Sequence, residues 1–496
     1  MRKTFLILKL TAALLAACAA PTQSPQPMSR LVERAATSAP PTLRPSPTVV
    51  KSNPTSTPSS ATSDAPFGSS VLLAAWNNRS KQHDLRPYDP RTGLPLAGYA
   101  PIQLGRNFRY AFSADEKTLA VLAYPSDMNQ RGGVLRLIDA QAWRDVTTTL
   151  KIDGWAYVMS FSPDGSRLAV AYFDESAGRS PQAEAIIVID VASQTVAARI
   201  APGFLPHVLE FTPDGQSLVV YGAGSESGNG LNSTARVALF NAADLSVMWE
   251  QPLPDVLDGQ YGESASHEPG QSVWWTPAVV SSPDRRTLYI VHADEDKLTT
   301  IDFADRSVTS VEIGPARSWL DRLMTMGAGV AHAKVLDGTR RHGVLSSDGA
   351  RLYVVGETVK STQDAHGNWQ ITQTPLGLAV VDAATGVEMA KLESQATEIG
   401  LSPDGSQLYL RGWSDIGVPW TDVVDVARLE TTTHLTGRYA IPAWQMDGTP
   451  IVLANDTHTG STTLAALEVP ALREVHVWSV PQYAVWVSPM WNPRQW

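Results

Sequence analysis

The chain has 496 residues, a net charge of −10 and a pI near 5.5. This length allows more than one domain, but the acidic balance offers no basic stripe of the kind that binds nucleic acid, so we expect no nucleic-acid partner. The single cysteine, Cys18, excludes an intrachain disulfide.

The first segment has the pattern of a bacterial lipoprotein signal peptide. A basic pair precedes a mostly apolar run, and the tetrapeptide Leu15-Ala16-Ala17-Cys18 resembles the lipobox, in which the cysteine thiol is lipidated. We therefore predict a signal peptide over residues 1–17 and a lipid on Cys18. Lys9 interrupts the apolar run, and an ordinary secretory signal with an incidental cysteine is the alternative.

Residues 18–66 are rich in proline, serine, threonine and alanine. Such a composition cannot bury enough apolar area to offset the entropy lost on ordering. We predict a tether, partly extended by its prolines, that carries a domain of residues 67–496 away from the bilayer. Because no later stretch is apolar enough to span a membrane, the lipid is the expected anchor.

A hairpin signature recurs through the domain. In Ser162-Pro163-Asp164-Gly165 the proline presets φ, the aspartate can accept bonds from the backbone that follows, and the glycine accepts positive φ. An alternating apolar strand follows each copy. Matching copies lie at Ser113-Ala114-Asp115, Thr212-Pro213-Asp214-Gly215, Ser282-Pro283-Asp284, Ser346-Ser347-Asp348-Gly349, Ser402-Pro403-Asp404-Gly405 and, in a worn form, Met446-Asp447-Gly448.

A second signature, an apolar strand that ends in Asp or Asn, lies between the hairpins. Its copies end at Asp139, Asp190, Asn241, Asp302, Asp382 and Asp425. Repeats of about 40–50 residues with four short strands each are typical of β-propeller blades. The fold class predicted is therefore all-β, a single propeller, with apolar residues such as Val219, Val220, Val354 and Val355 between the blades.

The two ends of the domain complement each other. Residues 484–489 resemble a first strand that lacks its partner, and residues 69–76 resemble a second strand that lacks its first. We predict that these N- and C-terminal strands share one blade and remove the free sheet edges. The count is then eight four-stranded blades, with seven as the alternative if the worn copy at Asp447 forms no full blade.

These repeats resemble the YVTN-type and TolB-like propellers, which are distant relatives of WD-repeat proteins. The resemblance covers about residues 70–490 and implies the fold rather than one activity. The turn at residues 382–386 is similar to the docking repeat of quinoprotein dehydrogenases, but Val387-Glu388 follows where that family has a tryptophan, so no quinone is predicted. Propeller lactonases share the fold, and no residue set here is assigned to their reaction.

The connections predict which face is functional. In each blade, lettering the strands A to D from the channel outward, the short A–B and C–D turns lie on one face and the D–A and B–C connections on the other. The long connections all belong to the second kind, and they span residues 173–185, 222–235, 251–274, 314–341 and 357–375. Loops this long are usually functional, so we predict the binding surface there. Decoration without function is the alternative.

Register supplies candidate binding residues at the channel mouth. Trp155 and Trp275 share one offset from the turn aspartate, Tyr157 and His207 another, and His342 and Glu398 a third. The full set of candidates is Trp155, Tyr157, His207, Trp274, Trp275, Trp319, Arg341, His342 and Glu398. Aromatic and basic side chains suit recognition of a protein, peptide or glycan. Tryptophans that plug the channel or cap blade edges are the alternative, and residues 316–324 are either a short helical lid or a packed loop.

The motifs of common enzymes are absent from the sequence. No nucleophile elbow, His-Glu-x-x-His, Walker loop or Cys-x-x-Cys occurs. Asp294, Glu295 and Asp296 are interpreted as a solvated turn, so no metal and no cofactor are predicted. We expect a non-catalytic, lipid-anchored, extracytoplasmic monomer that binds an envelope protein, peptide or glycan. A lactonase-like enzyme at the channel mouth and a structural envelope component are the alternatives.

Overall fold

The structure is a computed structural model. It describes residues 67–124, 132–146, 150–174, 177, 184–224, 234–261, 273–315, 338–363, 369–402, 404–414, 417–446, 449–456, 463–479 and 484–487. The predicted signal peptide, Cys18, the tether, Trp319 and the predicted lid at residues 316–324 lie outside the described residues. The described residues belong to one compact unit.

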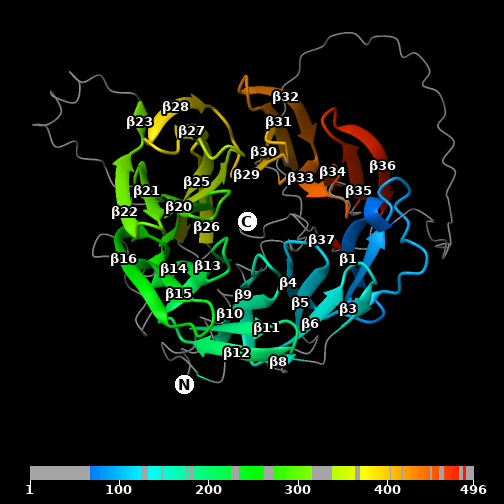
Figure 1. The fold of residues 1–496 in the computed structure, drawn as a ribbon. Helices are drawn as coiled ribbons and strands as arrows, with labels where there is room; N and C mark the ends of the chain where they lie inside the picture. Colours follow the sequence, from blue (N-terminus) through cyan, green and yellow to red (C-terminus); the bar gives the residue numbers. More distant parts are fainter. Residues whose placement is uncertain are drawn as a thin grey trace, which may run out of the picture. The chain divides into compact units, whose positions relative to one another are not determined.

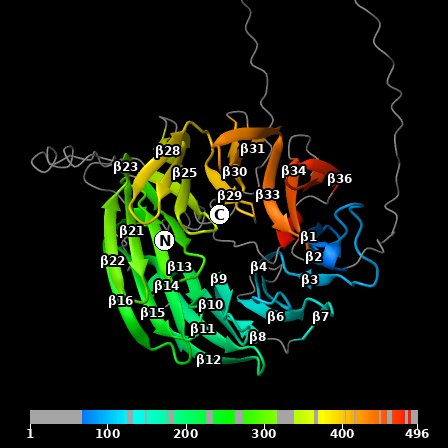
Figure 2. The same cartoon turned by 45° about the horizontal axis from the view of Figure 1, so that its top comes forward.

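The described strands form eight sheets arranged in a ring, in chain order, and all their strand pairs are antiparallel except β18 with β24 and β23 with β28 (Figures 1 and 2). The predicted single β-propeller is confirmed. Seven sheets take their four main strands from one continuous stretch of chain, and the remaining sheet joins both ends of the domain.

The first four blades are built from short strands that follow one another along the chain. The first holds β1 (Val71–Asn77), β2 (Gln82–Tyr88), β3 (Ile102–Leu104) and β37 (Ala484–Val487), after the 3-10 turn η1 (Phe67–Ser69). The second holds β4 (Asn107–Phe112), β5 (Thr118–Tyr124), β6 (Gly133–Asp139), β7 (Arg144–Asp145) and β8 (Leu150–Ile152). The third holds β9 (Gly154–Phe161), β10 (Arg167–Asp174), β11 (Glu184–Asp190) and β12 (Thr195–Ile200). The fourth holds β13 (Phe204–Phe211), β14 (Ser217–Gly224), β15 (Thr234–Asn241) and β16 (Val247–Leu257).

The other four blades repeat this order, with additions to the sixth. The fifth holds β19 (Ala278–Ser281), β20 (Thr287–Val291), β21 (Lys297–Asp302) and β22 (Ser307–Glu312). The sixth holds β24 (Gly338–Leu345), β25 (Arg351–Gln363), β26 (Trp369–Pro375), β27 (Leu378–Asp382) and β28 (Val387–Leu392), extended by β17 (Gly259–Tyr261), β18 (Val273–Thr276) and β23 (Gly314–Pro315). The seventh holds β29 (Glu398–Leu401), β30 (Gln407–Trp413), β31 (Pro419–Asp425) and β32 (Glu430–Thr436). The eighth holds β33 (Arg438–Trp444), β34 (Pro450–Asp456), β35 (Thr463–Glu468) and β36 (Arg473–Ser479).

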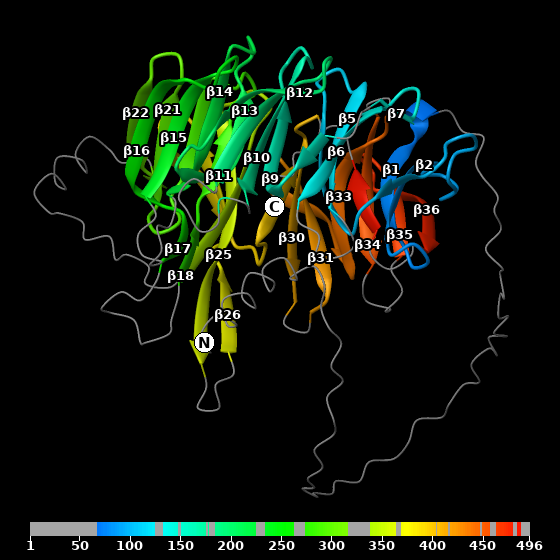
Figure 3. The same cartoon turned by 90° about the horizontal axis from the view of Figure 1, so that it is seen from below.

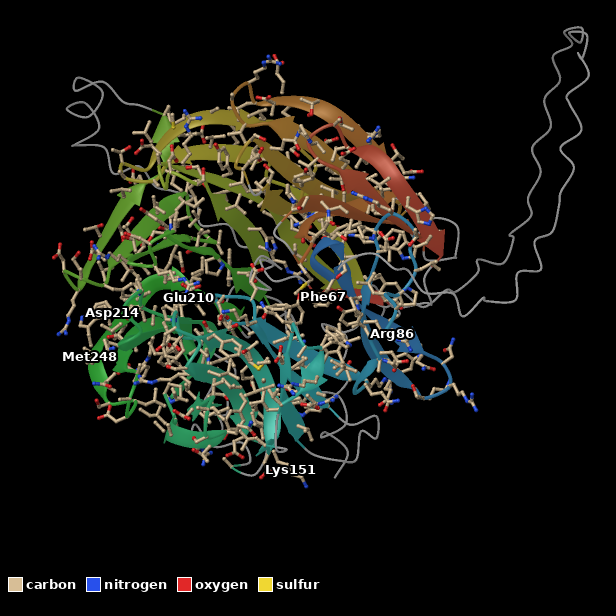
Figure 4. All side chains as sticks on the ribbon, turned by 45° about the vertical axis from the view of Figure 1, so that its right-hand side comes forward. Phe67, Arg86, Lys151, Glu210, Asp214 and Met248 are labelled. Carbon is tan, nitrogen blue, oxygen red and sulfur yellow. The ribbon has the colours of Figure 1, made fainter. Side chains whose placement is uncertain are left out.

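The ring closes by pairing the last strand with the first. β37 lies antiparallel to β1, with Leu72 opposite Val487 and Ala75 opposite Ala484. This is the predicted sharing of one blade by the two ends of the domain. Phe67, labelled in Figure 4, lies at the start of the described chain. Its ring stacks on that of Tyr99 with centroids 5.1 Å apart.

The core consists of eight apolar clusters of described residues, one between each pair of neighbouring blades. The cluster that closes the ring joins Leu73 of the first blade to Leu453 and Trp478 of the eighth. Because a blade without a neighbour would expose such a face to water, eight clusters support eight blades. The predicted core positions between blades are confirmed, since Val220 and Val355 are buried.

The C–D turns explain the recurring Asp or Asn at the end of strand C. In seven of them, including the turn at Asp89 of the first blade, its side-chain oxygen accepts backbone N–H groups of the turn, as Asp382 Oδ1 does from Thr385 at 2.8 Å. The residue four positions later has positive φ in all eight blades, at Gly93, Trp143, Gln194, Leu245, Arg306, Gly386, Leu429 and Leu472. Each blade therefore has one such turn, and the eight turns agree with eight blades.

The A–B turns are held by the motif aspartate. Ser162 Oγ donates to Asp164 Oδ1 at 2.6 Å, and the Ser166 N–H donates to the same oxygen at 3.1 Å. Gly165 follows with a φ of 71°. In the two copies without glycine, Glu116 and Arg285 adopt the same left-handed conformation, at a cost of about 1 kcal/mol each.

Replacing Asp164 with alanine is expected to destabilise the protein at pH 6 and to matter progressively less as the pH falls. The hydrogen bonds from Ser162 and Ser166 lower the pKa of Asp164 to about 2. Stabilisation by the carboxylate is therefore fully present above its unfolded pKa of about 3.9 and is lost as the pH falls through the folded value. Urea unfolding of wild type and variant between pH 6 and pH 3 measures this. Asp305→Ala, at an exposed position in a C–D turn, is the control, and an equal loss at every pH would contradict the prediction.

The strand order places the two kinds of connection on opposite faces of the ring. One connection that was expected to be a loop is a hairpin instead. The A–B and C–D turns form the turn face, and the D–A and B–C connections form the loop face. Residues 357–375 were expected to be a B–C loop, but β25 continues to Gln363 and pairs with β26 from Glu357 onward. This hairpin projects from the loop face (Figure 3). Alternating threonine and other β-formers in both arms account for it.

Candidate functional site

The candidate residues lie at the loop-face ends of the inner strands. Strand A of each blade begins on this face, and strand B ends there. Tyr157 and His207, predicted at equivalent positions, each stand at a β-bulge, where the register of β9 against β10 and of β13 against β14 shifts by one residue. A bulge adds a residue to one strand and changes the direction of its side chain. The structure thus gives these two residues the same local geometry in neighbouring blades.

We call the first of two groups of side chains on this face the charged rim, defined as Arg340, His342, Glu357, Glu398 and Arg411. Arg340 and Glu357 are directly opposed on β24 and β25, and Glu398 and Arg411 on β29 and β30. Arg340 Nη1 lies 3.8 Å from Glu357 Oε1, and Arg411 Nε lies 3.8 Å from Glu398 Oε2. Two cross-strand ion pairs therefore stand side by side in the sixth and seventh blades.

Arg411 is the most buried member of the charged rim, with 1% of its surface exposed. Its Nη2 donates to the Ile399 carbonyl at 3.3 Å, and its guanidinium carbon lies 5.2 Å from the centroid of the Tyr439 ring in the eighth blade. Burial lowers the pKa of Arg411 to about 10, against the opposing effect of Glu398. The side chain remains charged at neutral pH and links two blades at the rim.

Burial shifts the pKa values of the charged rim in opposite directions: it raises those of the two acids and lowers that of the histidine. Burial raises the pKa of Glu398, with Arg411 opposing and Glu357 adding to the rise. Burial also raises the pKa of Glu357, and Arg340 and Gln373 oppose it. Burial, Arg411 and Arg340 together lower the pKa of His342 to about 4, so this imidazole is neutral at pH 7.

An aromatic pair, made of the exposed Trp413 and the half-buried Tyr439, lies next to Arg411. Trp413, two residues further along β30, is 53% exposed, and its ring centroid is 6.1 Å from that of Tyr439 at an interplanar angle of 31°. Tyr439 therefore contacts a cation through Arg411 and a second ring through Trp413. A rigid strand that presents a large aromatic side chain to solvent is a common feature of binding hot spots.

The second group, which we call the aromatic rim, consists of Tyr124, Trp155, Tyr157 and Glu184 in the second and third blades. Trp155 stacks on Tyr124 with centroids 4.5 Å apart and an interplanar angle of 25°. Trp155 is 38% exposed and Tyr157 37% exposed, so both predicted candidates reach solvent. Burial raises the pKa of Glu184 to about 7.

His207 is held by an acid that the sequence analysis did not select. Its Nδ1 lies 2.9 Å from Oδ2 of Asp258, a buried residue in the connection between β16 and β17. Burial lowers the pKa of His207, but the charge and hydrogen bond of Asp258 outweigh it, and the net pKa is raised.

Increasing the pH above neutrality is expected to remove the stabilisation that protonated His207 provides. Because the folded pKa lies above the unfolded value of about 6.5, this contribution is fully present below that value and is lost as the pH rises through the folded pKa. Urea unfolding between pH 5 and pH 9 measures the effect. The variant Asp258→Asn should lose the pH dependence assigned to the pair, and an unchanged profile would contradict the assignment.

The remaining predicted residues occupy different environments. Trp275 is 6% exposed and is no surface contact. It belongs to β18, which pairs with β17 and β24 rather than with the inner strand of the fifth blade, so its register does not match that of Trp155. Trp274 lies on the same strand. Arg341 points to the other side of β24 from the charged rim and donates to Asp296 at 2.8 Å, beside a cavity of about 200 Å³ between the fifth and sixth blades.

The described residues hold no group of three or more His, Cys, Asp or Glu side chains that could bind a metal ion. Of the acidic run, Asp294 is buried and Asp296 pairs with Arg341. Within the part of the chain that the structure describes, no helix is long and apolar enough to cross a membrane.

No family model and no curated protein matches the chain. Among solved structures, dihydro-heme d1 dehydrogenase NirN in complex with DHE is similar with a TM-score of 0.54 and 12% identity, over 86% of this chain and 77% of that one. A eukaryotic initiation factor has a TM-score of 0.48 and 12% sequence identity, over 85% of this chain and 99% of that one. The β-propeller domain of Cps50 (Swd1) from Myceliophteria thermophila has a TM-score of 0.38 and 13% sequence identity, over 76% of this chain and 98% of that one. At these identities the first similarity bears on the fold alone, and the two lower scores carry no argument.

Proposed function

We propose that this chain is a non-catalytic binding propeller of the YVTN-type and TolB-like kind. It is held at the outside of a bacterial membrane by a lipid on Cys18 and binds an envelope protein, peptide or glycan through its loop face. The observation that carries the proposal is the exposed Trp413 beside Tyr439, next to the buried Arg411. An aromatic anchor on a rigid strand, with charge beside it, is the composition that binding surfaces favour.

The turn face supports this assignment by contrast. Its aspartates are engaged by hydrogen bonds within their own turns, as Asp164 is with Ser162 and Ser166. Such groups have little capacity left for a partner. On the loop face, large aromatic side chains and ion pairs lie at the ends of strands from several blades.

The test uses the full-length protein as bait for detergent-solubilised envelope, with two variants. Trp413→Ala removes the proposed anchor, and Met389→Ala removes an equally exposed apolar side chain on the outer strand β28. We expect a specific component to be retained by wild type and by Met389→Ala and lost from Trp413→Ala. Retention of nothing above background, or equal retention by both variants, would remove the support for this surface.

The anchor is tested separately by labelling cells with a fatty acid. Wild-type protein should carry the label and Cys18→Ala should not. A chain that is released unlabelled from wild-type cells would place Cys18 in an ordinary secretory signal instead.

A further inference from the structure

We propose that the aromatic rim, formed by Tyr124, Trp155, Tyr157 and Glu184, binds an organic ammonium group such as a quaternary or methylated amine. This names a ligand chemistry for the loop face and therefore rests on the proposed function. The site lies between the second and third blades, and is separate from the charged rim and from Trp413.

The backbone places these four residues together. Trp155 is opposite Phe173 on β10, and Phe173 is opposite Glu184 on β11, so one row crosses three strands on a single side of the sheet. Stacking of Trp155 on Tyr124 shows that this side faces the second blade. Tyr157 is brought to the same place by its bulge: burial raises the pKa of its phenol, and the Glu184 carboxylate and Tyr124 add to the rise.

The Glu184 carboxyl is the unusual group of the site. Its Oε2 is buried and accepts no hydrogen bond from the residues that the structure describes. A carboxylate in such a place is expected to be paired with a cation. Burial raises its pKa, and no charged group among the described residues contributes to that shift.

The charged groups around Glu184 are engaged or lie elsewhere. Asp174, on the neighbouring strand β10, forms an ion pair with Arg199 of β12. Arg109 of β4 is exposed, and its charge acts on Tyr124. Burial raises the pKa of Tyr124, and Arg109 opposes that rise only in part. Among the described residues, the Glu184 carboxyl acts on the phenol of Tyr157, and Tyr124 of the second blade acts on that same phenol.

Two exposed aromatic side chains, Trp155 and Tyr157, with the buried Tyr124 stacked against Trp155, and a carboxyl oxygen without a described hydrogen-bond partner suit a cation with an apolar surface. The ring faces attract an ammonium group through their quadrupoles, and Trp, Tyr and Phe cages are the usual sites for quaternary ammonium ligands. The carboxylate supplies the opposite charge. A sugar would need several hydrogen-bonding groups, and the side chains of the aromatic rim offer one carboxyl, one indole N–H and two phenols, one of which is buried. An anion would be repelled by Glu184.

The decisive comparison uses choline and its neutral isostere 3,3-dimethylbutan-1-ol, titrated into the full-length protein by calorimetry. We expect saturable binding of choline and at least tenfold weaker binding of the alcohol. Glu184→Gln, which keeps the shape of the side chain, should weaken choline binding about tenfold or more, and so should Trp155→Ala. Met389→Ala, which truncates an exposed apolar side chain on β28 of the sixth blade, should bind choline like wild type.

The pH dependence offers a readout that needs no variant. Because the cation favours ionised Glu184, whose pKa is about 7, choline affinity should rise about tenfold from pH 6 to pH 8, and binding near pH 7 should release a proton to the buffer. In Glu184→Gln the affinity should be independent of pH over this range. Circular dichroism of each variant confirms that it is folded.

Three results would overturn the proposal: equal affinity for choline and the alcohol, unchanged binding by Glu184→Gln, or no saturable binding of choline. Binding of methyl glucoside in place of choline would identify a sugar site instead. These outcomes are distinct from failure of the proposed function, since loss of envelope partners on Trp413→Ala concerns a different pair of blades.

Discussion

Replacing Arg411 with alanine is expected to lower the free energy of unfolding by about 3 kcal/mol, because removing one partner of a buried ion pair leaves the other charge uncompensated. The variant loses the contact with Glu398, the hydrogen bond to the Ile399 carbonyl and the packing on Tyr439. The Glu398 carboxyl, whose pKa burial already raises, then has no cation beside it on β30. Urea unfolding at pH 7 measures the loss.

The neighbouring eighth blade supplies the control. Arg438 pairs with Glu474 at 2.9 Å on a more exposed part of the surface, and such pairs contribute about 0–1 kcal/mol. Arg411→Ala should therefore cost clearly more than Arg438→Ala. The double variant Arg411→Met with Glu398→Leu should recover much of the loss, since apolar residues can replace a buried pair. Equal effects of the two single substitutions would show that Arg411 is not the link between blades described here.

Shortening Leu73 to alanine is expected to lower the free energy of unfolding by about 3 kcal/mol, the usual cost of emptying a fully buried leucine site. Leu73 belongs to β1 of the first blade, yet its apolar partners, Leu453 and Trp478, belong to the eighth. The cluster exists because the two ends of the domain meet. The size of the loss therefore reports on ring closure.

Val247→Ala on the outer strand β16 is the comparison, because Val247 is exposed and its replacement should change stability by no more than about 0.5 kcal/mol. Both variants keep the charge and the backbone unchanged. If Leu73→Ala were as mild as Val247→Ala, the side chain would not be packed between two blades, and the ring would be open at that point.

The fold could be predicted because its determinants are local and repeated. The hydrogen bonds of Asp164 and the positive φ of Gly165 follow from the residue types in a four-residue turn. The same physics at each repeat sets the spacing of the strands. Where the motif lacks glycine, as at Arg285, the neighbouring strands impose the conformation, and only the alignment of repeats reveals it.

The candidate site could be predicted only in part. Counting from the turn aspartate placed Tyr157 and His207 correctly relative to each other, since both stand at bulges. The same count failed for Trp275, because β18, which precedes the fifth blade in the chain, pairs with β24 of the sixth blade. Local spacing cannot show that exchange of strands between blades.

The sequence analysis did not select Arg411 or Glu184 as candidates, although the sequence contained a signal for Arg411. In strand B, the register position of Arg411 holds Ala171, Tyr221 or Val355 in other blades. A charge in an otherwise apolar strand indicates a buried partner. For Glu184 no comparable signal exists, because its environment depends on residues of two blades that are far apart in the sequence.

The most direct test of the account is a cross-link between the ends of the ring. In a Cys18→Ser background, Ala74→Cys and Val485→Cys occupy opposed positions of β1 and β37, close enough for a disulfide. Mild oxidation of the folded protein should produce an intramolecular cross-link, seen as faster migration on a non-reducing gel. The pair Ala74→Cys and Val475→Cys, on strands that do not pair, should give none. Absence of the first cross-link in folded protein would contradict the closed ring and the loop face built on it.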